Sequence, residues 1–128
     1  MSYYLSKMLT VSFDEAVSRV TEALKKEGFG ILTEIDVSAT LKKKIQVDFP
    51  SYRILGACNP TLAYEALKLE NMVGTMLPCN VVVRNAGHGQ TEVAAINPVA
   101  SMQAIDNPAL KQAAAQVLAK LEKVIADL

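Results

Sequence analysis

The sequence predicts a two-layer α+β domain, with a mixed five-stranded sheet and helices packed mainly on one face. Amphipathic helical stripes alternate with short β-rich runs, and glycine, proline and asparagine separate them. The chain has 128 residues, of which 51% are hydrophobic, enough for one core. No repeat or linker divides the sequence, so we expect a single domain over residues 1–128.

The first helix is expected at about residues 13–27. Ser12 and Glu15 have the spacing of a capping box, in which the serine hydroxyl accepts a hydrogen bond from the Glu15 amide. Gly28 follows as a residue that readily takes the left-handed conformation at a helix end. Between them the apolar residues recur at helical spacing: Phe13, Val17, Val20 and Leu24.

Three further helix starts are predicted where asparagine precedes proline, since asparagine caps a helix and proline fits its first position. The pairs are Asn59-Pro60, Asn97-Pro98 and Asn107-Pro108. The first begins a helix, the second only a short turn, and the third a long amphipathic helix. A shorter helix is expected over residues 38–45, with Asp36 or Ser38 as its cap.

Five strands are expected, at residues 4–11, 29–37, 52–58, 76–84 and 91–96. Residues 85–90 contain two glycines, so the last two strands should form an antiparallel hairpin. A helix between the third and fourth strands would normally make that pair parallel, and the sheet therefore mixed.

Composition argues against several functional classes. Thirteen basic and thirteen acidic side chains are mixed along the chain, so no nucleic-acid partner is expected. No apolar run approaches the roughly 20 residues of a membrane span, and the start does not resemble a signal peptide. Two cysteines do not make a disulfide framework. We expect a cytoplasmic protein with reduced thiols and no membrane partner.

The turn from strand 52–58 into the next helix is the candidate ligand site. Gly56, Ala57 and Cys58 lead to Asn59, and a helix start presents amides and a positive dipole at the end of the strand. Lys42, in a run of three lysines, could add countercharge. We predict that these five residues bind a small anionic molecule. The alternative is that Gly56 permits close packing, the asparagine merely caps, and the lysines form a solvated face.

A thiol enzyme or redox sensor is a second hypothesis. Cys58 stands one residue before the helix cap, where the dipole favours the thiolate. Cysteines are also commonly buried in cores, and this alternative holds for Cys58 and for Cys79. Parallel third and fourth strands would keep the two thiols apart, whereas antiparallel strands would let them meet.

The remaining polar candidates are weaker. His88 lies in the glycine-rich hairpin loop, and together with Cys58 and Cys79 it does not make a zinc-binding set, so no metal site is expected. Glu34 and Asp36 alternate on one strand, a spacing that could pair two carboxylates, but solvation at a strand edge explains them equally well. No catalytic residue is assigned, and the cofactor is left open.

Four blocks carry a resemblance to a known family: residues 30–37 (GILTEIDV), 40–42 (TLK), 52–60 (YRILGACNP) and 77–83 (LPCNVVV). In order and spacing they resemble the domain of unknown function 302 family. The resemblance implies a small α+β domain that forms homodimers, with no established activity. We therefore expect a non-enzymatic homodimer that binds a small anionic molecule. A purely structural dimer or assembly module is the third hypothesis.

Overall fold

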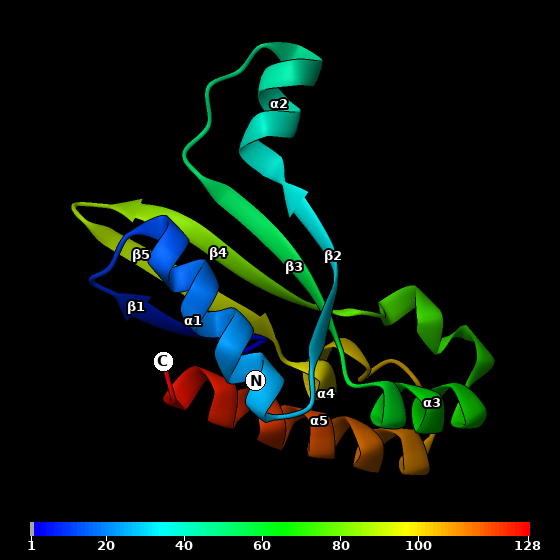
Figure 1. Ribbon diagram of the computed structural model, residues 1–128. Coiled ribbons are helices and arrows are strands. Elements are labelled where there is room, and N and C mark those ends of the chain that lie inside the picture. The colour runs from blue at the N-terminus through cyan, green and yellow to red at the C-terminus, as the bar shows by residue number, and fades with distance from the viewer. Residues whose placement is uncertain (1) are drawn as a thin grey trace.

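Five strands and their connecting helices form the structure, a computed structural model that describes residues 2–128 (Figure 1). The strands are β1 (Tyr4–Leu9), β2 (Gly30–Asp36), β3 (Tyr52–Cys58), β4 (Cys79–Gly87) and β5 (Gln90–Ile96). The helices are α1 (Phe13–Lys26), α2 (Val37–Ile45), α3 (Pro60–Leu69), the 3-10 helix η1 (Asn71–Met76), α4 (Pro98–Ser101) and α5 (Pro108–Ala126). The two-layer α+β prediction is confirmed.

The sheet has the order β1-β5-β4-β3-β2, and every neighbouring pair is antiparallel. The expectation of a mixed sheet was therefore wrong. The reason is that α3 does not cross over the sheet. It runs beyond the strand ends, η1 turns the chain back, and β4 begins where β3 stopped, with Ala57 opposite Cys79. Figure 1 shows α3 at this end of the sheet and α2 at the other.

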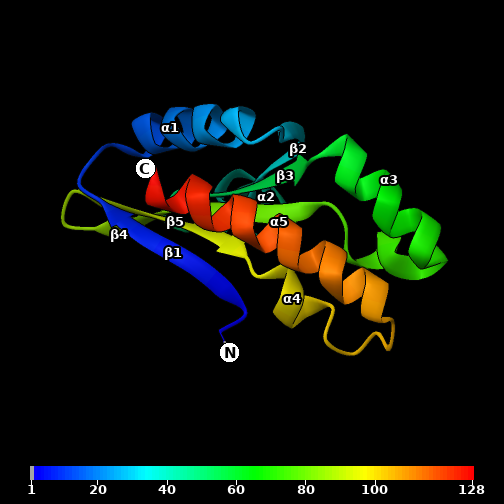
Figure 2. The ribbon, with the colours of Figure 1, turned by 90° about the horizontal axis from the view of Figure 1, so that it is seen from below.

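Helices α1 and α5 pack on one face of the sheet and enclose the main core. Leu24 of α1 and Leu121 of α5 are fully buried there, against Val81 and Val83 of β4 and Val93 of β5. In Figure 2, α5 continues past the sheet to α3 and α4. A smaller core joins those elements and consists of Ala66, Val73, Met102, Leu110 and Ala114. On the opposite face of the sheet, which we call the open face, no helix packs within residues 2–128.

The predicted helix caps are confirmed. Ser12 accepts a hydrogen bond from the Glu15 amide at 3.1 Å, and Asp36, not Ser38, accepts one from Ala39 at 2.9 Å. The three asparagines cap as expected, accepting from amides of the first turn. The β4–β5 hairpin is also confirmed, with His88 at its tip. Within residues 2–128, no helix has the length and apolar character to cross a membrane.

Candidate functional site

The turn from β3 into α3 borders a cavity of about 330 Å³, which we call the turn cavity. Its walls come from β2, β3 and α3, from η1 and the start of β4, and from one position of α5. The lining is apolar apart from the Asn59 amide: Phe29, Leu32, Ala57, Cys58, Asn59, Leu62, Ala63, Leu67, Gly74, Leu77, Pro78, Cys79 and Val117.

Three of the predicted site residues lie on this cavity, and a fourth lies beneath it. Ala57 is fully buried, Cys58 is half-buried at the strand end, and Asn59 begins the helix. Gly56 does not line the cavity, because the Thr33 side chain and the Pro78 ring cover it. A Cβ atom at Gly56 would overlap Thr33 Oγ1 and lie 2.8 Å from Pro78 Cγ. Close packing, the alternative considered for this glycine, is what the structure supports.

The start of α3 has little capacity left for an anion. Pro60 has no N–H, the Leu62 amide donates to Asn59 Oδ1 at 3.2 Å, and the Ala63 amide donates to the Asn59 carbonyl at 2.9 Å. Among the described residues, only the Thr61 amide of this first turn has no acceptor. The dipole remains, but one amide replaces the group of donors expected from the sequence.

Asn59→Ala is expected to lower the free energy of unfolding by about 1 kcal/mol, because the Leu62 amide loses its cap. The same side chain also donates to the Glu27 carbonyl at 3.4 Å and so links the end of α1 to α3. Urea denaturation would measure the change. Asn59→Asp is the matched control, since it keeps the capping oxygen. Equal stability of the wild type and the alanine variant would contradict the assigned role.

Lys42 lies far from the turn. It is on α2, where its ammonium is 2.8 Å from Asp48 Oδ1. Helix α2 follows the Asp36 end of β2, whereas Cys58 pairs with Gly30 at the other end. Six residue steps along β2 separate these ends by roughly 20 Å. The structure therefore brings Ala57, Cys58 and Asn59 together on one cavity and leaves Lys42 outside it.

The two thiols lie at the same end of the sheet, because β3 and β4 are antiparallel. Cys79 is opposite Ala57, and Cys58 is the next residue of β3; both line the turn cavity. Both are free thiols. Burial, and to a smaller extent the neighbouring Cys58, raises the pKa of the Cys79 thiol to about 11. Cys79 is consequently protonated at neutral pH, which makes it a poor nucleophile.

The carboxylates singled out in the sequence have structural partners. Arg53 of β3 lies 3.1 Å from Glu34 Oε1 and 3.9 Å from Asp36 Oδ2, and its guanidinium stacks 5.2 Å from the Phe13 ring centroid. An arginine shared by both carboxylates favours an ion-pair role over acid–base chemistry. In residues 2–128, no cluster of three or more His, Cys, Asp or Glu side chains is arranged to hold a metal ion.

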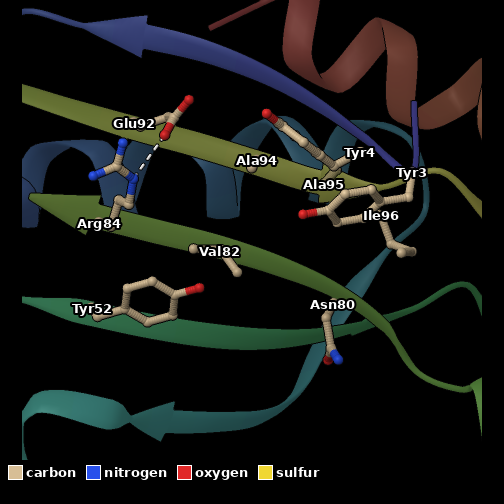
Figure 3. A pocket seen from close by; sticks show the side chains of 10 residues that line it. All are labelled: Tyr3, Tyr4, Tyr52, Asn80, Val82, Arg84, Glu92, Ala94, Ala95 and Ile96. Atoms are coloured by element: carbon tan, nitrogen blue, oxygen red, sulfur yellow. Dashed lines mark hydrogen bonds and ion pairs between the residues drawn. The ribbon is translucent and has the colours of Figure 1, made fainter. Parts of the chain in front are cut away.

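The sequence reasoning missed a second cavity, of about 400 Å³, on the open face (Figure 3). Tyr3 and Tyr4 stand at one side and Tyr52 at the other, with Val82 between them. The signal was present in β4 and β5, where residues 81–83 (VVV) and 93–96 (VAAI) are apolar at every position instead of alternating. Strands of this kind have two apolar faces, of which the helices cover one.

Comparison with known proteins gives a family and a fold. The family model described as "Domain of unknown function DUF302" matches residues 5–128. A crystal structure of an uncharacterised conserved DUF302 protein from Bacillus stearothermophilus superposes with a TM-score of 0.92 and 29% sequence identity, covering 99% of this chain and 98% of that chain. No curated protein matches. With the family model matching nearly the whole chain, this protein belongs to the DUF302 family of domains of unknown function.

Proposed function

We propose that this chain is a cytoplasmic, non-enzymatic homodimer that binds a small, largely apolar molecule in the turn cavity. The observation that carries the proposal is the cavity itself. Its volume of about 330 Å³ lies in the range of small-molecule sites, which are mostly apolar with a few polar groups. Among the described residues, the polar part of the lining consists of Asn59 and the two thiols. Asn59 caps α3 at the positive end of its dipole, which suits a single anionic or polar group of the ligand.

A binding role fits the lining better than a catalytic one. The ionisable side chains among the described residues around the turn cavity are the two thiols. General acid–base catalysis needs a group that exchanges protons near the working pH, and Cys79 holds its proton to about pH 11. The thiol hypothesis then depends on Cys58 alone, which has no histidine or basic side chain beside it on this cavity. Two unpaired cysteines are also typical of a reducing compartment.

The proposal is tested by titrating the ¹⁵N-labelled protein with octanoate and, separately, with 1-octanol. Both probes should perturb the amides of Ala57, Cys58, Thr61 and Ala63. Octanoate should bind a few-fold more tightly, because Asn59 and Leu62 of the lining lie at the positive end of the α3 dipole, which favours a carboxylate. Perturbations confined to β4 and β5 would place the probe on the open face and contradict the proposal.

A variant that fills the turn cavity with a larger side chain tests whether the ligand lies there. Ala63 is half-buried on α3 and lines the turn cavity, so Ala63→Phe should weaken octanoate binding at least about tenfold. Ala119→Phe, at an exposed position of α5, places the same ring on the surface and should leave binding unchanged. Cys58→Ser should retain most of the affinity. Unaltered binding by Ala63→Phe would show that the ligand lies elsewhere.

The homodimer is supported by the uncovered apolar surface of the sheet. A fold with a single helical layer leaves one sheet face in water. Here that face carries a cavity lined mainly by tyrosine, valine, alanine and isoleucine, together with Asn80 and the Arg84–Glu92 ion pair. Apolar patches of this kind commonly mark protein interfaces. A structural dimer without a ligand would share this surface, and the octanoate titration distinguishes the two functions.

A further inference from the structure

At the centre of the open face an apolar row crosses four of the five strands and ends at Ser6 on β1. The register places Ile35, Ile54, Val82, Ala94 and Ser6 side by side, from β2 to β1. At one end of the row, Ile35 is 48% exposed. Val82 is at its centre, because β4 is the middle strand of the sheet. Antiparallel sheets usually carry polar residues on a solvated face. This row has four apolar members and one serine, which is the composition of a covered face.

A second apolar segment continues from this row. Residues 37–51, which we call the α2 arm, consist of α2 and the chain that leads into β3, and they project beyond the end of the sheet (Figure 1). Helix α2 buries none of its residues, and Ile45, Val47 and Phe49 are 58%, 42% and 43% exposed. The Phe49 ring packs edge-on against Tyr52, with 6.0 Å between centroids, and Tyr52 lines the open-face cavity. The arm and the open face therefore form one surface.

From this continuity we infer that a second copy of this chain docks on the open face and the α2 arm together, an inference that rests on the proposed homodimer. Strands of six to nine residues, five abreast, give a face of roughly 500 Å². Stable interfaces bury roughly 600–1,000 Å² per partner. The nine-residue helix α2 adds roughly 130 Å², so the face reaches the required size only with the arm.

The charges at the centre of the open face do not oppose self-association. Arg84 and Glu92 lie beside the cavity and pair with each other at 2.7 Å, which leaves the surface around Val82 neutral. Two identical copies related by a twofold axis therefore meet without like-charge repulsion at the centre. Because β4 is the middle strand, an axis near Val82 brings the two open-face cavities against each other. The partner thus closes a cavity that is open in one chain.

Sedimentation equilibrium of the full chain at micromolar concentration tests the inference. The wild type should have twice the 13.8 kDa chain mass. Val82→Lys should raise the dimer dissociation constant about thirtyfold, because it places a charge at the centre of the interface. Phe49→Ala, on the arm, should raise it about tenfold. Ala119→Lys, on the exposed surface of α5, is the matched control and should dimerise as the wild type does.

The outcomes separate this surface from the homodimer itself. If the wild type is dimeric and Val82→Lys is equally dimeric, the two copies meet elsewhere and this inference is wrong. A monomeric wild type would overturn the homodimer as well, and the open face would then be left for another occupant. Circular dichroism should show that Val82→Lys is folded. Met8→Lys, at a 44% exposed position of the same face, provides a second variant should the first fail to fold.

Discussion

Gly56→Leu is expected to lower the free energy of unfolding by about 3 kcal/mol. Gly56 is buried between the Thr33 side chain and the Pro78 ring, and even a Cβ atom there overlaps Thr33 Oγ1 and lies 2.8 Å from Pro78 Cγ. A proline ring cannot rotate away, so the larger side chain has to displace the start of β4 from β3. Urea denaturation would measure the loss as a lower midpoint. The slope of the unfolding free energy against urea concentration should be the same as in the wild type.

A double-mutant cycle identifies the cause. Gly56→Ala should cost about 2 kcal/mol, and Thr33→Ala in the same chain should recover part of it, because the first atom that the new methyl meets is then absent. Ala114→Gly, on α5, cannot serve as the control for Gly56→Ala. It removes a methyl group and opens space in the core, whereas Gly56→Ala adds a methyl group to a filled space. Additive effects of the two substitutions would show that Thr33 does not limit the space at Gly56.

The same contact corrects a sequence-based expectation about the ligand site. Gly56 was expected to belong to the anion site at the helix start, whereas the structure uses it for close packing against Thr33 and Pro78. Sequence shows that a glycine precedes a helix start, but it does not show which side chains from other strands cover it. Thr33 lies 23 positions earlier and Pro78 lies 22 positions later, and only the β2-β3-β4 arrangement brings them together. Ala63 on the cavity wall is the sharper probe of binding.

Helix boundaries could be predicted because their causes are local. The hydroxyl of Ser12 and the amides of Asn59 and Asn107 act within three residues, and each cap formed as expected. Strand direction depends on where a whole connection goes. The third and fourth strands were expected to be parallel because a helix joins them, but that helix lies beyond the sheet end and packs against α5. No local pattern distinguishes the two paths.

The candidate site was predicted only in part, because some of its residues are neighbours in the sequence and others come together only through the fold. Ala57, Cys58 and Asn59 are consecutive, so any fold that makes the turn places them together. Lys42 could reach them only if α2 folded back, and instead it follows the far end of β2. Part of the apolar lining of the turn cavity comes from β2, η1 and α5, which are not adjacent to the turn in sequence. The position of the site was therefore accessible to sequence reasoning, whereas the chemistry of its walls was not.

The stability of the protein is expected to fall by about 2 to 3 kcal/mol between pH 9 and pH 11 because of Cys79 alone. Burial raises the pKa of this thiol from 9.0 to about 11. In that interval the unfolded chain has lost the thiol proton while the folded chain keeps it, so rising pH favours the unfolded state. The contribution is fully present below pH 9 and is lost as the pH rises to 11.

Urea denaturation at several pH values, compared between wild type and Cys79→Ala, measures this contribution, because tyrosines and lysines that titrate in the same range cancel in the difference. The alanine variant should lose the additional alkaline slope. Cys58→Ala should keep most of it, since burial is the larger cause and the neighbouring Cys58 the smaller. Equal slopes in the wild type and Cys79→Ala would mean that the Cys79 thiol ionises normally. Cys79 would then be a second reactive thiol on the turn cavity, which would support the hypothesis of a thiol enzyme or redox sensor.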